Sequence, residues 1–118
     1  MTDEQIALAR RAVACKGWKS MGGMLYADGA WRARVGDGWN WRAGAEVLPV
    51  LDDPATLGCL LAMVREAWGG DFEQVWLEWY PPLSRWGIQG GHAGTRSVLL
   101  ASGPTEAEAL VAALEAAP

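Results

Sequence analysis

Tryptophan content is the feature that most limits what this chain can fold into. Eight tryptophans occur in 118 residues, together with one phenylalanine and two tyrosines. They stand at positions 18, 31, 39, 41, 68, 76, 79 and 86. One small core cannot easily enclose eight indoles, each with an N–H that needs a hydrogen-bond partner. We therefore expect some of these rings on the surface, where tryptophan is enriched in protein-binding hot spots.

Length and composition indicate a single globular domain over residues 1–118. The chain is 51% apolar and 20% charged, which predicts a folded core without metal or disulfide cross-links. The longest apolar runs are too short to span a bilayer, and the amino terminus does not resemble a signal peptide. Cys15 and Cys59 stand alone, at no metal-ligand or redox spacing. These features predict a protein of the reducing cytoplasm with no membrane partner.

The first part of the chain changes from helical to strand periodicity. Residues 3–16 are expected to form a helix that buries Ile6, Ala9 and Val13 and ends at Gly17.

A β-hairpin is expected next, over residues 24–35. Asp28 and Gly29 form its two-residue turn, because this pair readily adopts positive φ. A short third strand is expected at 39–42 and a loop at 46–52.

The central helix has the clearest boundaries. Asp53 is the expected N-cap, Pro54 fits the first helical position, and Gly69 with Gly70 ends the helix. Close packing against a sheet is the expected reason for Gly58 inside it. The apolar stripe is Leu57, Leu60, Leu61, Val64 and Trp68.

Alternation predicts a second group of strands, at 74–80, 83–88 and 97–101. The Pro81–Pro82 pair should start the first turn. Residues 87–95 contain four glycines and are expected to form a mobile hairpin loop.

A last helix is expected from Thr105, which has capping-box spacing to Glu108. Its buried stripe is Ala107, Leu110, Val111 and Leu114. The elements therefore follow the order α-βββ-α-βββ-α. This order predicts an α+β domain in which three helices pack in layers with antiparallel sheet.

Charge is divided unevenly between the two halves of the chain, whose net charge is −4. Residues 1–50 hold seven basic and five acidic groups, and residues 51–118 hold three and nine. The first half could provide a nucleic-acid footprint only if its basic groups cluster. These groups are Arg10, Arg11, Lys16, Lys19, Arg32, Arg34 and Arg42.

Three segments resemble small hypothetical proteins of bacteriophages and prophages. They are LARR at 8–11 with Gly17 and Trp18, DDPATLGCLL through VREAWG at 52–69, and PTEAEALVAAL at 104–114. The sequence is similar to the group called the phage ABA sandwich domain. This resemblance implies helices on both sides of an antiparallel sheet and a location in the host cytoplasm. It transfers no catalytic or cofactor-binding residue, and it implies an accessory protein that binds a host component, often a defence system.

Catalytic chemistry is not expected. His92 is the sole histidine and lies in the glycine-rich segment, where a solvated loop residue is the simpler interpretation. Of the paired carboxylates, Asp53 is explained as a cap and Asp52 as a loop charge. The glycines lack the spacing of phosphate loops, and one histidine with two separated cysteines does not build a zinc site. We expect no enzyme activity, cofactor or metal.

The tryptophans leave three roles open: core packing, base stacking and protein binding. Segments 31–34 and 39–42 interleave tryptophan with arginine, as base-stacking surfaces do, although strand alternation sends the two residue types to opposite faces. Exposed aromatics with one or two arginines are typical of protein-binding sites. The set around the Pro81–Pro82 turn fits this pattern better. It comprises Trp76, Trp79, Tyr80, Arg85 and Trp86.

The sequence therefore predicts a non-enzymatic phage or prophage accessory protein that binds another protein of the host or the phage. Inhibition of a host defence complex, of the anti-CRISPR or another anti-defence type, is the expected role. The alternatives are a nucleic-acid-binding module that uses the basic first half, and a structural phage protein that self-associates as a homodimer.

Overall fold

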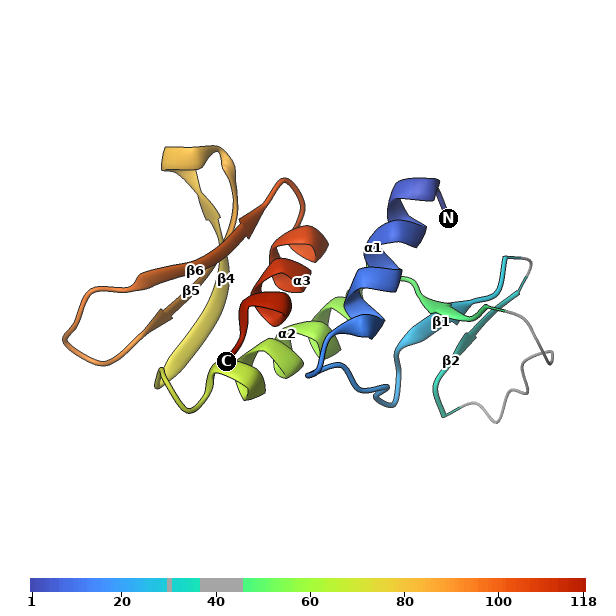
Figure 1. Cartoon of the computed structure of the whole chain (residues 1–118), viewed down its shortest axis with the longest axis horizontal. Coiled ribbons are helices and arrows are strands. Elements are labelled where there is room, and N and C mark those ends of the chain that lie inside the picture. The colour runs from blue at the N-terminus through green and yellow to red at the C-terminus, as the bar shows by residue number, and fades with distance from the viewer. Residues whose placement is uncertain (30, 37–45) are drawn as a thin grey trace.

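A computed structural model of the chain describes residues 1–29, 31–36 and 46–118 (Figure 1). The described elements follow the order predicted from the sequence, with three strands after each of the first two helices. The helices are α1 (Asp3–Ala14), α2 (Pro54–Trp68) and α3 (Glu106–Ala116). The predicted α+β class is confirmed.

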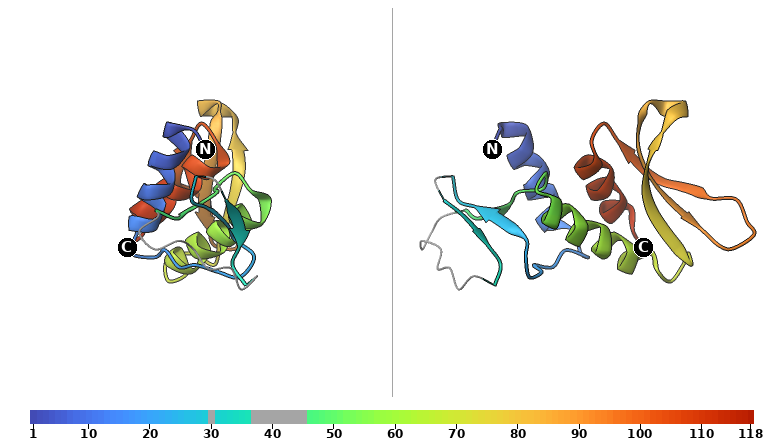
Figure 2. Two further views of the ribbon diagram at one scale, coloured as in Figure 1. Left: turned by 90° about the vertical axis from the view of Figure 1, so that its right-hand side faces the viewer. Right: turned by 180° about the vertical axis from the view of Figure 1, so that it is seen from behind.

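Two antiparallel sheets lie at opposite ends of the helices (Figures 1 and 2). The first sheet, in the order β2-β1-β3, contains β1 (Leu25–Ala27), β2 (Arg32–Arg34) and β3 (Leu48–Pro49). The second, in the order β4-β5-β6, contains β4 (Gln74–Tyr80), β5 (Arg85–Gly91) and β6 (Val98–Gly103). The phage-protein resemblance implies one sheet between helices, whereas here the helices lie between two sheets.

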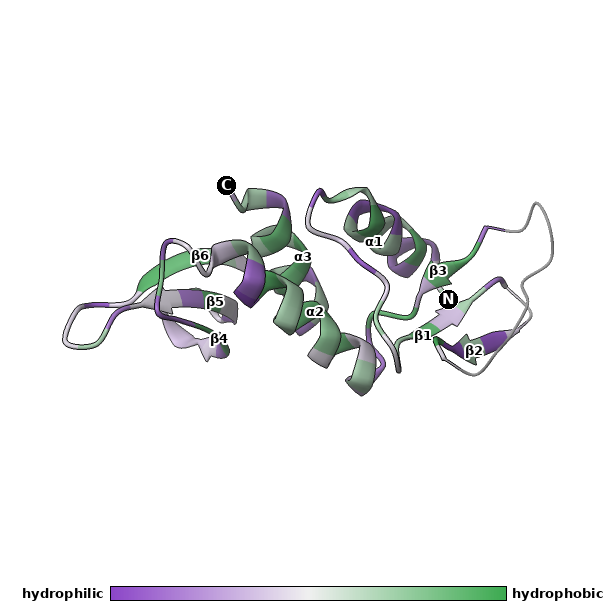
Figure 3. Cartoon of the chain, turned by 90° about the horizontal axis from the view of Figure 1, so that it is seen from below, coloured by the Kyte–Doolittle hydropathy of each residue, from purple (hydrophilic) through white to green (hydrophobic). Residues whose placement is uncertain are grey.

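The core lies where α2 and α3 pack against each other and against the second sheet. Leu60, Leu110 and Ile88 are fully buried there, and Figure 3 shows apolar residues gathered on α2, α3 and β6. Burial of each such side chain contributes roughly 1.5–3 kcal/mol. The end of β6 contacts the backbone of α3 directly, because a Cβ at Gly103 would lie 2.6 Å from the amide nitrogen of Ala109.

The caps and buried faces of α2 and α3 follow the prediction closely. The Asp53 carboxylate accepts from the Thr56 amide, and Thr105 accepts from the Glu108 amide. All four residues of the predicted α3 stripe are buried. In α2 the buried face is rotated slightly, so that Thr56 and Met63 are buried while part of the predicted stripe is half-buried.

Gly58 does not pack against a sheet, so the reason predicted for its presence is wrong. It is exposed, and a Cβ built on it meets nothing within 4 Å. The residue lies on the face of α2 that is turned to solvent.

Helix α1 is shorter than predicted and buries a different residue. It ends at Ala14 with Cys15 as its C-cap, before Gly17, and it begins with a capping box between Thr2 and Gln5. Ala12 is buried, whereas Val13 is 38% exposed. The buried stripe of α1 is narrow because, among the described elements, this helix packs mainly against α3 and the short strand β3.

The first hairpin turns one residue later than predicted. Ala27 pairs with Arg32, and the Asp28 side chain accepts from the Trp31 amide at 3.0 Å. Gly29 supplies a φ of +96°, so this glycine contributes to the turn as expected.

The third strand of this sheet also differs from the prediction. The strand expected at 39–42 lies outside the described residues. Part of the segment expected as a loop, 46–52, forms β3 instead, because its buried Leu48–Pro49 pairs with β1. The Val50 amide extends this pairing by donating to the Leu25 carbonyl at 2.8 Å.

Strand β5 contains most of the segment predicted as a mobile loop. Its glycines remain in the ladder from Gly87 to Gly91 because neighbouring side chains occupy the space that their own side chains would take. A Cβ at Gly87 would lie 2.9 Å from Leu99 Cδ1, and one at Gly90 would lie 2.7 Å from the ring of Phe72. The connection to β6 begins only at residue 92.

Among the residues that the structure describes, no helix is long and apolar enough to cross a membrane.

Candidate protein-binding surface

Six of the eight tryptophans lie in the described part of the chain, and none of the six is fully buried. Trp31 and Trp79 are 55% and 48% exposed. Trp18, Trp68, Trp76 and Trp86 are half-buried. The prediction that surplus indole reaches the surface is confirmed for these residues.

The predicted binding residues all lie on the hairpin formed by β4, the 3-10 turn Pro81–Leu83 and β5. In the antiparallel pairing of β4 with β5, Trp79 lies opposite Trp86 and Tyr80 lies opposite Arg85. Because side chains alternate along a strand, the Trp79–Trp86 pair lies on the face toward the helices. Trp76, Tyr80 and Arg85 lie on the opposite face. The structure therefore does not bring the five residues into one patch.

Trp79 and Trp86 pack edge to face, with ring centroids 5.7 Å apart and an interplanar angle of 80°. This geometry is favourable for aromatic pairs. Trp86 also packs against the core, which fixes the pair, while Trp79 stays exposed. Leu83, in the turn between the strands, is 50% exposed. We call Trp79, Leu83 and Trp86 the hairpin patch.

On the opposite face of the second sheet the aromatic rings have a structural role. A Cβ at Gly91 would lie 3.5 Å from the Trp76 ring, and one at Gly87 would lie 3.3 Å from Tyr80 Cβ. A ring that covers a glycine, as that of Trp76 does, stabilises a strand that would otherwise pack poorly. Half-burial of Trp76 and Tyr80 follows from this arrangement.

A groove of about 640 Å³ lies beside the hairpin patch. The amino-terminal ends of α1, α2 and α3 surround it, and Trp86 forms part of its wall. Its apolar lining includes Leu8, Leu51, Leu57, Trp86 and Ala107. Among the described residues, the charged side chains that line it are the carboxylates of Glu4, Asp52, Glu106 and Glu108.

The groove is open because α1 and α3 are held together at their other ends. Both helices run from the top to the bottom of Figure 1, and Arg11 near the end of α1 pairs with Glu115 of α3 at 2.5 Å. Within the lining of the groove, Gln5 Nε2 donates to the Asp52 carboxylate at 3.4 Å and links α1 to the segment before α2.

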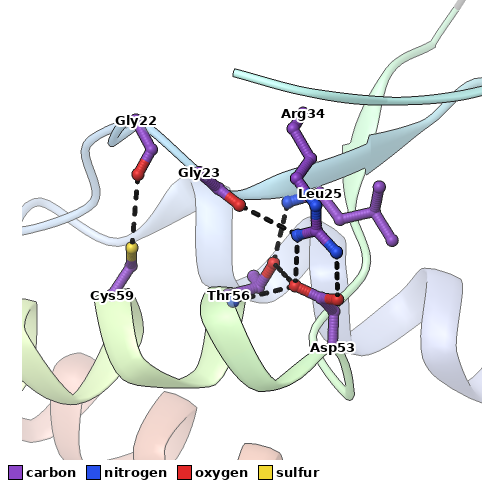
Figure 4. Close-up of polar contacts among 7 residues, drawn as sticks. All are labelled: Gly22, Gly23, Leu25, Arg34, Asp53, Thr56 and Cys59. Carbon is purple, nitrogen blue, oxygen red and sulfur yellow. Dashed lines mark hydrogen bonds and ion pairs between the residues drawn. The ribbon is translucent and has the colours of Figure 1, made fainter. Parts of the chain in front are cut away.

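Asp53 fixes the first sheet to α2 (Figure 4). Its carboxylate accepts from Arg34 Nη1 at 2.9 Å and Nη2 at 3.0 Å and from the Thr56 amide at 3.1 Å. Thr56 Oγ1 in turn accepts from the Leu25 amide at 2.9 Å. The hydrogen bonds from Arg34, followed by those from Thr56, hold the pKa of Asp53 well below its usual value. Asp53 is thus a structural cap, as the sequence predicted.

The predicted basic cluster is largely engaged in ion pairs within the protein. Arg10 pairs with Glu46 at 2.6 Å, in addition to the pairs of Arg11 and Arg34 described above. Lys19 pairs with Glu66 at 2.6 Å. Carboxylates at these distances neutralise much of the charge that a phosphate backbone would need. Arg42 lies outside the described residues.

His92 is an exposed residue of the β5–β6 connection, as expected, and its ring also makes contacts within the protein. Its Nε2 lies 2.8 Å from the backbone oxygen of Asp71, its Nδ1 lies 3.4 Å from the Glu73 carboxylate, and its ring packs 5.8 Å from Phe72. These contacts join the end of β5 to the α2–β4 connection. The ring partners are a carbonyl, a carboxylate and an aromatic ring, which do not compose a nucleophile–base pair.

The two cysteines are half-buried free thiols. Burial, followed by the negative charge of Glu115, raises the pKa of Cys15, which disfavours the reactive thiolate. Within residues 1–29, 31–36 and 46–118, no group of three histidine, cysteine or acidic residues is placed to hold a metal ion.

Sequence reasoning missed Leu83 and the groove. The sequence places Glu106 and Glu108 in the first turn of the last helix, but nothing local indicates that they approach Glu4, about a hundred residues away. Leu57 was assigned to the core stripe, yet it lines the groove.

Comparison with known proteins found no matching family model and no similar curated protein or solved structure. The resemblance to phage proteins stays a prediction.

Proposed function

We propose that this chain is a non-enzymatic protein that acts by binding another protein through the hairpin patch. The observation that carries the proposal is the exposure of Trp79 on a rigid support. Its ring stands at the end of a β-hairpin and packs on Trp86, which the core holds in place. A fixed indole loses little conformational freedom when a partner covers it.

The expected contribution of Trp79 is large enough to make it a hot spot. A tryptophan side chain presents up to about 250 Å², so an exposed fraction of 48% leaves roughly 120 Å² for a partner to cover. At about 25 cal/mol per Å² this corresponds to roughly 3 kcal/mol. Loss of that energy weakens binding by about two orders of magnitude.

Two observations favour a protein partner over a nucleic acid. The basic residues of the first half are largely paired with carboxylates, and the groove beside the hairpin patch carries acidic side chains. Such a surface repels phosphate. The further proposal of a phage or prophage accessory protein that inhibits a host defence complex in the cytoplasm rests on the resemblance alone.

Affinity capture from a bacterial lysate tests the proposal, with the tagged wild-type chain compared with Trp79→Ala. Trp31→Ala is the matched control, because it removes a comparably exposed indole that lies just before β2, at the other sheet. Wild type and Trp31→Ala should retain one stoichiometric protein that Trp79→Ala loses. Circular dichroism should show that all three proteins are folded.

Capture of no stoichiometric protein, or equal capture by Trp79→Ala and Trp31→Ala, contradicts the proposal. Light scattering distinguishes self-association: a dimer that Trp79→Ala dissociates identifies a second copy of the chain as the partner.

A further inference from the structure

The groove next to the hairpin patch shares a wall with it. Trp86 both lines the groove and packs against Trp79. A partner that covers Trp79 therefore reaches the mouth of the groove. The volume of about 640 Å³ is in the range of pockets that accept ligands or several side chains.

The groove combines an apolar lining with a negative rim. Glu4 lies in the first turn of α1, Glu106 and Glu108 lie in the first turn of α3, and Asp52 precedes α2. Each helix contributes about half a positive charge at its amino-terminal end. Three such ends, together with the amino group of Met1, do not cancel four carboxylates, and the rim stays negative.

The cations of α1 do not compensate this charge. Arg10 is engaged with Glu46 and Arg11 with Glu115, and neither arginine lines the groove. The groove therefore offers apolar contact and negative charge together, which is a combination that neither an anion nor a purely apolar segment satisfies.

We propose that this groove binds a cationic, amphipathic segment of the partner protein. The segment seats an apolar side chain against Leu8, Leu57 and Trp86 and places lysine or arginine beside the carboxylates. This inference rests on the proposed function, because it assigns the chemistry of the partner that the hairpin patch contacts. A basic amphipathic helix can bind an acidic groove in this way, with its apolar face against the apolar lining and its cations beside the carboxylates.

Fluorescence anisotropy with two labelled peptides tests the inference on the full chain. Both peptides are amphipathic, span roughly four helical turns and place leucine at the same positions; one carries lysine and the other glutamate at the polar positions. The lysine peptide should bind, and its affinity should fall as salt is raised from about 0.05 to 0.5 M. The glutamate peptide should not bind.

Matched carboxamide variants locate the binding site. Glu4→Gln with Glu106→Gln removes two charges from the rim, and we expect about fivefold weaker binding of the lysine peptide. Glu66→Gln with Glu73→Gln removes the same charge from exposed positions elsewhere and should change affinity less than twofold. These substitutions conserve side-chain shape, and circular dichroism should show the same fold for both.

Equal weakening by the two double variants overturns the inference, since it indicates attraction to net charge alone. Binding of the glutamate peptide, or no binding of the lysine peptide up to about 1 mM, also overturns it. A dimer that dissociates in Glu4→Gln with Glu106→Gln assigns the groove to a second copy and likewise overturns it. In each case, loss of the captured protein in Trp79→Ala still supports the proposed function, so the two failures are distinguishable.

Discussion

Replacing Asp53 with alanine removes three connections at once. The amino-terminal end of α2 loses its cap, Arg34 loses a bidentate partner, and Thr56 Oγ1 loses its contact with the carboxylate. Loss of the cap costs about 1–2 kcal/mol. The pair with Arg34, whose side chain is 43% exposed, contributes roughly 0.5–1 kcal/mol. Asp53→Ala should therefore lower the free energy of unfolding by about 2–3 kcal/mol, or the Tm by roughly 8–12 °C.

Two further variants separate these contributions when urea unfolding is monitored by tryptophan fluorescence and circular dichroism. Asp53→Asn keeps an oxygen acceptor for the Thr56 amide but loses the charge facing Arg34, and we expect a loss of about 1 kcal/mol. Asp52→Ala removes the neighbouring carboxylate, which accepts only a long bond from Gln5, and should cost less than about 0.5 kcal/mol. The reasoning is refuted if Asp52→Ala and Asp53→Ala destabilise the protein equally.

Four further outcomes are expected from the packing and the charges. Gly103→Ala should destabilise the fold by about 3 kcal/mol in urea unfolding, because the added methyl meets the Ala109 backbone. Gly58→Ala, at an exposed helical position with open space, should stabilise it by about 1 kcal/mol. Trp68→Phe should cost about 1–2 kcal/mol by loss of the indole bond to a carbonyl of α3. Because the pKa of Asp53 is lowered in the folded state, its contribution to stability is present at neutral pH and should decline as pH falls below about 5; the urea midpoint of Asp53→Asn should decline less steeply.

A Gly103→Ala variant as stable as the wild type, or a Gly58→Ala variant less stable than the wild type, would contradict the assigned packing. Parallel pH profiles for the wild type and Asp53→Asn would contradict the assigned cause of the acid sensitivity. A Trp68→Phe variant as stable as the wild type would show that the indole bond contributes nothing measurable.

The helices could be predicted from the sequence because their signals are local. Asp53, Pro54 and Gly69 mark α2 within a few residues, and Thr105 marks the start of α3. Strand β4 was also predictable, since alternation and the following prolines define it. In these elements the backbone conformation depends on neighbouring residues, so the pattern alone was sufficient.

Residues 85–88 of β5 belong to the strand expected at 83–88, but the rest of β5 and the groove could not be predicted because both depend on distant residues. Glycines normally indicate a turn, yet Gly90 belongs to a strand that packs beneath Phe72, and Trp76 covers Gly91. The register of the first hairpin, between β1 and β2, likewise depends on the pairing of its strands and not on the turn residues alone. The groove forms only because residues from both ends of the chain lie close together in the fold. No spacing in the sequence indicates this proximity.

Photo-crosslinking from the hairpin patch in living cells tests the central claim most directly. A photoreactive amino acid replaces Leu83, which is 50% exposed, or Trp31, which is 55% exposed and lies just before β2. The account predicts a crosslinked product of one defined mass from position 83 and none from position 31. No product from position 83, or the same product from both positions, would contradict it.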